Sequence, residues 1–187
     1  MITLSEHRIV ISPVGTVDSE LFEPISIRIK RIFGCKTEVI PSIQDISFAL
    51  DPQREQYHST PILEKLAQAA PGEAIKIIGI TSVDLFIPIL TYVYGEAQIG
   101  WAACIISTHR LAEGLFLSAD EDTYFERLSK EAVHELGHTF KLRHCKDNAC
   151  IMHYCRSIKD VDRKSQQFCR YCKILLEDEM KRIGDSM

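Results

Sequence analysis

The sequence contains no apolar run long enough to cross a lipid bilayer. Its longest runs, AIKIIGI (74–80) and AACIIS (102–107), are far shorter than the ~20 residues of a membrane-spanning helix. Residues 1–15 lack the basic region, apolar core and small-residue cleavage site of a signal peptide. With a single Trp and a net charge of -4, the chain also gives no reason to expect a nucleic-acid partner. We therefore expect a cytoplasmic protein that binds neither membrane nor nucleic acid.

Cysteine is concentrated near the carboxy terminus of an otherwise ordinary globular composition. Apolar residues make up 45% and charged residues 26% of the 187 residues, a length that suits one domain. In a reducing compartment, clustered cysteines bind metal more often than they form disulfides. Cys35 and Cys104 stand alone in apolar surroundings, so we expect them to be buried core residues. The other five lie in the last quarter of the chain: Cys145, Cys150, Cys155, Cys169 and Cys172.

The order of elements predicts an α/β fold with a mostly parallel sheet and helices packed on it. We expect Thr60 to be the N-cap of one helix. The capping-box pair Ser118 and Glu121 is expected to open a later helix. Residues 47–60 are expected to form an irregular loop. The expected strands are 8–15, 36–43, 74–86 and two short ones within 91–108 at a sheet edge; the expected helices are 19–33, 61–70, one ending near Thr139 or Phe140, and 172–183.

The stretch HELGH within the third predicted helix has the arrangement of zinc peptidases. His134 and His138 are four residues apart, so both imidazoles lie on one face of the helix and can bind one ion. Glu135 lies about 100° around the helix, where it can reach a water molecule on that ion. Zinc would lower the pKa of this water and the glutamate would take its proton.

His144 completes the set only if the helix ends before it. In a continuous helix, His144 would lie ~9 Å farther along the axis than His138 and on another side. The chain must therefore turn back between them. Three protein ligands would then leave a fourth position open, which distinguishes a catalytic zinc from a structural one.

The segment HELGHTFKLRHCKDNACIM, followed by CRYC, resembles the signature of the archaemetzincin family of metzincin metallopeptidases over residues 131–172. The resemblance implies a compact metzincin-like fold with an antiparallel edge strand, an active-site helix and a small cysteine-rich carboxy-terminal subdomain. It implies peptide-bond hydrolysis by zinc-activated water, with His134, His138 and His144 as zinc ligands and Glu135 as general base. Met152 would lie in a Met-turn below the histidines.

In metzincin-like clefts the strand before the active-site helix lies antiparallel to the bound peptide. By this likeness the segment GWAACIIS (100–107) would line the groove. Tyr154 would either face the cleft and stabilise an oxyanion or be an ordinary packed aromatic residue.

Lys141 departs from the family pattern, which has glycine at this position. The family glycine ends the helix with a positive φ, and a residue with a side chain costs ~1–2 kcal/mol in that conformation. Such a cost is tolerable if neighbouring structure holds the turn.

Cys145 with Cys150, and Cys169 with Cys172, form two pairs suited to one tetrahedral site of four thiolates. Such a closed site would be structural, so we expect two zinc ions per chain. A redox-active pair and a rubredoxin-type iron centre remain alternatives. The resemblance makes Cys155 a residue outside the site.

Residues 141–173 contain nine Lys/Arg and three Asp/Glu. This surplus suits an anionic metal site or acidic peptides better than nucleic acid. We expect one metallopeptidase domain over residues 1–187, with an α/β part (1–140) and a zinc-stabilised part (141–187), acting as a monomer on peptides or proteins. A non-catalytic zinc protein that holds a peptide or partner on the same scaffold is the alternative.

Overall fold

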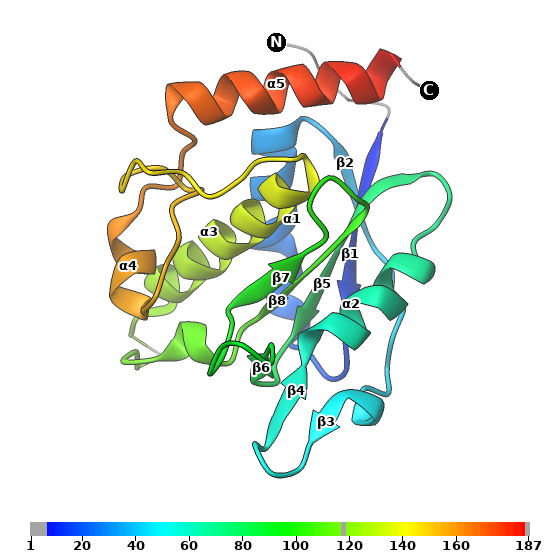
Figure 1. Ribbon diagram of the computed structural model, residues 1–187, viewed down its shortest axis with the longest axis vertical. Helices are drawn as coiled ribbons and strands as arrows, with labels where there is room; N and C mark the ends of the chain where they lie inside the picture. The colour runs from blue at the N-terminus through cyan, green and yellow to red at the C-terminus, as the bar shows by residue number, and fades with distance from the viewer. Residues whose placement is uncertain (1–6, 117–118, 186–187) are drawn as a thin grey trace.

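A twisted five-stranded sheet forms the centre of the computed structural model, which describes residues 7–116 and 119–185 (Figure 1). The strand order is β2-β1-β5-β8-β7, with β7 antiparallel to β8 and the other neighbours parallel. The predicted α/β class and antiparallel edge strand are thus confirmed. The strands are β1 (Arg8–Pro13), β2 (Lys36–Val39), β5 (Ala74–Thr81), β7 (Gly95–Ala97) and β8 (Ala103–Ser107).

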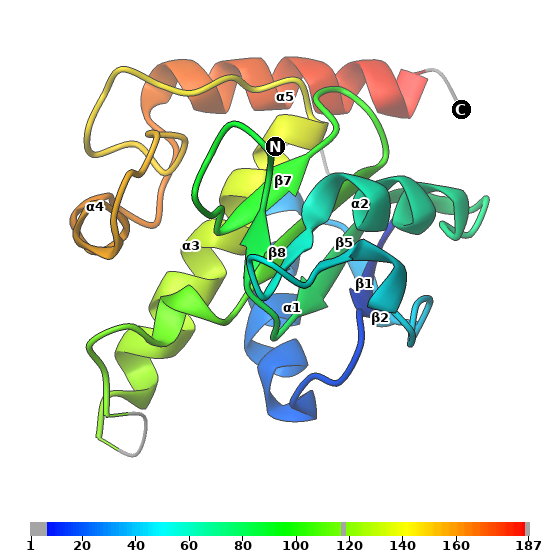
Figure 2. The same cartoon turned by 60° about the horizontal axis from the view of Figure 1, so that its bottom comes forward.

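Helices cover both faces of this sheet (Figure 2). Because strand side chains alternate between faces, Ile9 of β1 packs toward α1 (Phe22–Phe33) and α3 (Glu121–Thr139), whereas Val10 packs toward α2 (Ser59–Gln68). Burial of each such side chain contributes about 1.5–3 kcal/mol. Cys35 and Cys104 are buried, as expected. A 3-10 turn (Ser19–Leu21) precedes α1, which ends at Gly34 with φ 66°, the predicted stop.

A small second sheet forms where the sequence predicts an irregular loop. It contains β3 (Leu50–Asp51), β4 (Gln56–His58) and β6 (Leu85–Phe86), after a 3-10 turn at Ser47–Ala49. The predicted N-cap at Thr60 is wrong, because α2 already begins at Ser59 and the Thr60 hydroxyl donates to Glu96 instead. The stability of this sheet comes from pairing with a distant strand, which local sequence patterns do not report.

The β3–β4 hairpin also holds the chain around residue 90. Arg54 donates to the carbonyl oxygens of Leu90 and Thr91, both at 3.0 Å, and Gln56 donates to Thr91 at 3.0 Å. These bonds fix the position of a segment that lines the cleft described below. The strongly polar hairpin therefore has a structural role that its sequence alone does not indicate.

Helix α3 begins at Glu121. The predicted capping box involves Ser118, which lies outside the described residues. Asp120 occupies the N-cap position without a side-chain cap hydrogen bond, and its carboxylate accepts from the Phe116 backbone N–H at 2.9 Å. A 3-10 turn (Arg110–Ala112) links β8 toward this helix.

The end of α3 is a left-handed turn at Lys141, with φ 64°. The Lys141 N–H donates to His138 O, and the Leu142 N–H donates to Gly137 O at 3.1 Å, the pattern of a Schellman C-cap. The predicted break of the helix before His144 is thus confirmed. The positive φ is kept without glycine.

Contacts from the sheet hold the last turn of α3. Lys76 of β5 is buried, and its Nζ donates to Thr139 O at 2.8 Å and to Trp101 O at 2.9 Å. The Gly100 N–H donates to His138 O at 3.0 Å. A cation at the carboxy-terminal end of a helix also interacts favourably with the helix dipole. These bonds satisfy carbonyl groups that a helix end leaves without partners.

The carboxy-terminal part contains α4 (Ile158–Arg163), which the sequence analysis did not predict, and α5 (Arg170–Asp185), which extends the predicted 172–183 helix at both ends. Figure 1 shows α5 lying across the end of α3. Lys141 Nζ forms an ion pair with Glu179 of α5 at 2.6 Å. The turn after α3 is therefore anchored on both sides.

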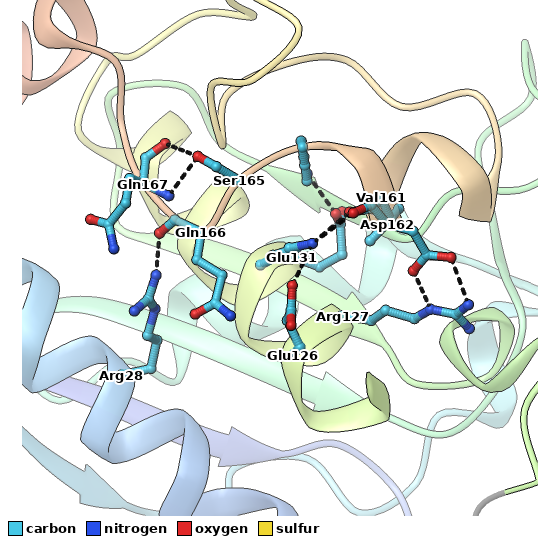
Figure 3. A network of polar contacts seen from close by, with 11 residues as sticks. Arg28, Glu126, Arg127, Glu131, Val161, Asp162, Ser165, Gln166 and Gln167 are labelled. Carbon is cyan, nitrogen blue, oxygen red and sulfur yellow. Dashed lines mark hydrogen bonds and ion pairs between the residues drawn. The ribbon is translucent and has the colours of Figure 1, made fainter. Parts of the chain in front are cut away.

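A network of mostly buried charges ties the segment 161–164, which is the end of α4 and the residue after it, to α3 (Figure 3). Arg127 binds both carboxylate oxygens of Asp162, at 2.7 and 2.9 Å, and Lys130 Nζ donates to Val161 O at 3.0 Å. Lys164 Nζ lies 2.7 Å from Glu131. Because an unpaired buried charge is costly, this network fixes one arrangement of the segment against the helix.

No helix in the described ranges 7–116 and 119–185 combines the length and apolar character of a membrane span.

We predict that Lys76→Met lowers the free energy of unfolding by about 1–3 kcal/mol, because the Thr139 and Trp101 carbonyl groups lose their donor. Urea denaturation of the zinc-loaded protein measures this effect, with exposed Lys181→Met as the matched control. Burial lowers the pKa of Lys76 from 10.5 to about 8. Between these values the unfolded chain binds more protons, so the Lys76 contribution to stability rises with pH. The deficit of the variant should therefore grow from pH 8 to pH 10; a shrinking deficit would contradict this assignment.

Candidate active site and metal centres

Three imidazoles converge at the carboxy-terminal end of α3, two from its last turns and one from the segment that follows. The Nε2 atoms of His134 and His138 are 3.2 Å apart, and one ring nitrogen from each of His134, His138 and His144 lies within 4.8 Å of the others. The His144 ring centroid is 4.8 Å from that of His138 and 5.3 Å from that of His134. The turn at Lys141 therefore brings the third histidine back to the first two.

Backbone carbonyl groups orient the two helical histidines. His134 Nδ1 lies 2.8 Å from Ile151 O, and His138 Nδ1 lies 2.7 Å from Leu142 O. Since a carbonyl oxygen only accepts, each Nδ1 carries the proton and donates it. Each Nε2 then presents its lone pair to the shared space, which is the tautomer that metal binding needs.

The protein environment favours neutral imidazoles at this site. Burial lowers the pKa of His134 and His138, and desolvation together with the nearby His138 lowers the pKa of His144 to about 4. All three rings are therefore neutral near pH 7, so a metal ion does not compete with protons for them.

Glu135 lies beside the histidines in a tightly packed position. It is buried against β7, where a Cβ atom added to Gly95 would come within 2.7 Å of Glu135 Cγ and 2.6 Å of Ile105 O. Burial raises the pKa of Glu135, and the carboxylate of Glu131 raises it further, while Lys164 opposes the change. A divalent cation next to it would also oppose the change.

Met152 packs directly below the histidine helix. A Cβ atom at Gly137 would lie 2.6 Å from Met152 Sδ, so only glycine allows this approach. Met152 is fully buried, and its carbonyl oxygen accepts from the Cys145 N–H at 2.8 Å. The methionine turn is thereby joined to the residue that follows His144.

Four cysteines form a second cluster next to this turn. One sulfur from each of Cys145, Cys150, Cys169 and Cys172 lies within 4.8 Å of the others, and the Cys145 and Cys169 sulfurs are 3.8 Å apart. The Cys172 N–H donates to Cys169 Sγ, which lowers the pKa of that thiol. Cys155 is not part of the cluster; its thiol lies near His153 O, and burial raises its pKa to about 11.

The dimensions of both clusters fit zinc. Nitrogens bound at ~2.0–2.1 Å to a tetrahedral ion lie about 3.3 Å apart, and thiolate sulfurs bound at ~2.3 Å lie about 3.8 Å apart. The separations in the structure are 3.2 Å between imidazole nitrogens and 3.8 Å between sulfurs. These two pairs therefore have the spacing of a tetrahedral zinc site, and the remaining donor atoms of each cluster lie within 4.8 Å of one another.

A cleft of about 690 Å³ opens over the three histidines and Glu135. Strand β7 and the residue before it (94–97) form one wall of the cleft, and residues 154–156 form another. Tyr154 is 41% exposed, and its ring centroid is 5.0 Å from that of His144. Tyr154 thus faces the cleft and is not a packed core residue.

The prediction that GWAACIIS lines the groove is wrong. Strand β8 within this segment pairs with β5 on one side and with β7 on the other, so its backbone groups are already bonded. The edge strand on this side of the sheet is β7, which lies between β8 and the cleft.

Sequence reasoning missed Gly95, Gly137 and Lys76 as determinants of the site. An isolated glycine within a strand or helix signals close approach of another group, and this signal was present at both positions. Lys76 gave no signal, because a lone lysine in an apolar strand pattern does not reveal which carbonyl groups it reaches.

Comparisons with known proteins agree with this geometry. Peptidase family M54 matches residues 29–178. Archaemetzincin from Archaeoglobus fulgidus is 38% identical over 167 residues, which are 88% of this chain and 96% of that protein. Archaemetzincin from Halobacterium salinarum is 35% identical over 171 residues, 89% of this chain and 97% of that protein.

Two crystal structures of archaemetzincins have the same fold. That from Methanopyrus kandleri superposes with a TM-score of 0.86 and 31% identity, covering 97% of this chain and 100% of that one. That from Archaeoglobus fulgidus gives 0.77 and 36%, covering 90% and 99%. This chain belongs to peptidase family M54, the archaemetzincin family of zinc metallopeptidases.

Proposed function

We propose that this peptidase holds one catalytic zinc ion on His134, His138 and His144 and uses Glu135 as its general base. The observation that carries the proposal is the 3.2 Å separation between the Nε2 atoms of His134 and His138. The Nδ1 atom of each ring is held by a backbone carbonyl oxygen. A cleft lies over these nitrogens, so a substrate has access to them.

The Glu135 carboxylate transfers protons during the reaction. Zinc at this site supplies Lewis acidity and lowers the pKa of a water molecule toward neutrality. Glu135 removes a proton from the attacking water and then donates a proton to the leaving amine. The Glu135 side chain packs against Gly95, and both residues line the cleft.

The edge strand β7 orients the substrate. An extended peptide lying antiparallel to Gly95–Ala97 would form backbone hydrogen bonds with this strand and place one peptide bond over the histidines. Tyr154, exposed beside His144, is placed to stabilise the oxyanion.

A second zinc ion on the four cysteines would be structural. Cys145 follows His144 directly and is bonded through its N–H to Met152 O. Loading of this site therefore holds the third histidine and the methionine turn together. Such a link offsets the cost of the left-handed Lys141.

We predict two zinc ions per chain in the parent protein, one after His138→Ala and one after Cys169→Ala. Each substitution removes one ligand of a different site, and the clusters do not share a ligand. Elemental analysis after gel filtration measures the ratio, and circular dichroism checks the fold. Cys155→Ser is the matched control for the thiol and should keep two ions. Loss of zinc in that control would contradict the assignment of the four ligands.

We predict that Glu135→Ala keeps both zinc ions and the fold but lowers kcat/KM for peptide hydrolysis by about 10²–10⁴-fold, the contribution of a general base. The exposed Glu64→Ala is the control and should match the parent. Unchanged turnover in Glu135→Ala would refute the role of this residue.

A hydroxamate inhibitor distinguishes the peptidase from a non-catalytic zinc protein that holds a partner. We predict micromolar or tighter binding of the hydroxamate to the parent, because it binds at an open coordination position of the zinc ion. We predict no binding after His138→Ala, because this variant loses the ion. Absence of binding to the fully zinc-loaded parent would favour the holding role.

A further inference from the structure

The charged groups along the cleft are not equally available to a substrate. Glu96 accepts from the Thr60 hydroxyl at 2.9 Å and also from Ser59, and Glu131 is paired with the buried Lys164 at 2.7 Å. Both carboxylates are thus engaged within the protein. Glu135 is the remaining carboxylate among the described residues of the cleft wall.

Two arginines of the cleft wall are in the opposite situation. Arg143 and Arg156 both line the cleft and are exposed. Within residues 7–116 and 119–185, neither guanidinium has a carboxylate at ion-pair distance, whereas Lys141 and Lys164 of the same basic segment are paired with Glu179 and Glu131. Their positive charges therefore face the cleft without compensation.

The two arginines lie toward opposite ends of β7. Arg143 follows the turn at Lys141, which packs on Gly100, beyond the carboxy-terminal end of the strand. Arg156 lies at the other end, where its carbonyl oxygen accepts from the Tyr92 hydroxyl at 3.3 Å. The three histidines lie in the same cleft between these ends.

The cleft is consequently electropositive when zinc is bound. Zinc brings two positive charges, and the three basic side chains of the wall, Arg143, Arg156 and Lys164, bring one each, five in all. The three carboxylates Glu96, Glu131 and Glu135 offset three of these, so the net charge stays positive. A low-dielectric cleft with charge of one sign concentrates ligands of the opposite sign.

We propose that Arg143 and Arg156 determine specificity for peptides with an acidic side chain on each side of the cleaved bond, an inference that rests on the proposed peptidase function. A peptide antiparallel to β7 has its amino-terminal side near Ile99 and its carboxy-terminal side near Tyr92. Arg143 then binds an acidic residue before the cleaved bond, and Arg156 binds one after it. A guanidinium fork matches a carboxylate with two parallel hydrogen bonds, which an amide cannot reproduce.

The test uses four fluorescent peptides with Glu or Gln at the two positions flanking one bond. Their affinities are measured by anisotropy on the zinc-loaded Glu135→Ala protein, and kcat/KM is measured on the parent. We expect each Glu to improve binding by about three- to tenfold over Gln, an effect that high salt reduces, as for partly exposed ion pairs. Arg143→Gln should remove only the preference before the bond, and Arg156→Gln only the preference after it. Lys159→Gln, an exposed basic residue outside the cleft wall, is the control and should keep both preferences.

Three results would overturn the proposal: equal affinity for all four peptides, including a complete absence of binding; preferences that survive both arginine substitutions; or preferences assigned to the arginines in reverse order. Charge-selective binding without hydrolysis by the parent would instead refute the peptidase function and leave the two arginine subsites standing. Hydrolysis without charge selectivity would refute the subsites and leave the peptidase function standing.

Discussion

The reversal of the backbone after Thr139 is the constraint on which the rest of this structure depends. Without it, the helix would carry His144 away from His134 and His138, and the three imidazoles could not bind one ion. The reversal uses a left-handed residue with a side chain, Lys141 at φ 64°, and is therefore unfavourable by itself. It exists because neighbouring groups bind both sides of the turn.

These neighbouring groups come from distant parts of the chain. Lys76 and Gly100, from the central sheet and the β7–β8 loop, bind the last carbonyl groups of α3, and Glu179 of α5 binds the Lys141 ammonium. Buried charges of α3 hold residues 161–164 at the end of α4, from which the chain leads to Cys169 and Cys172. The active-site helix is thus the common support for the histidines, the edge of the cleft and the cysteine cluster.

The sequence was informative wherever a short spacing determines geometry. Two histidines four residues apart on a helix, the helix break before His144 and the two cysteine pairs follow from helix geometry and ligand chemistry. The parallel sheet follows from apolar β-branched runs separated by helical patterns. The structure agrees with each of these expectations.

What could not be predicted depends on contacts between residues far apart in sequence. Strand β4 pairs with β6, which lies far along the chain, and β8 lies inside the sheet because it pairs with the distant β5 as well as with β7. The strand assigned to the groove is therefore one position too far inside the sheet. Lys76, Glu131 and Lys164 look like ordinary surface charges in the sequence. Their burial is set by tertiary packing, and so is their effect on the site.

A zinc-edge anomalous diffraction map of crystals of the zinc-loaded protein tests the central claim most directly. The account predicts one anomalous peak bonded to the Nε2 atoms of His134, His138 and His144 at ~2.0–2.1 Å, with Lys141 left-handed. A peak bonded to His134 and His138 alone, with the His144 ring turned into solvent and Lys141 in an ordinary helical conformation, would contradict it.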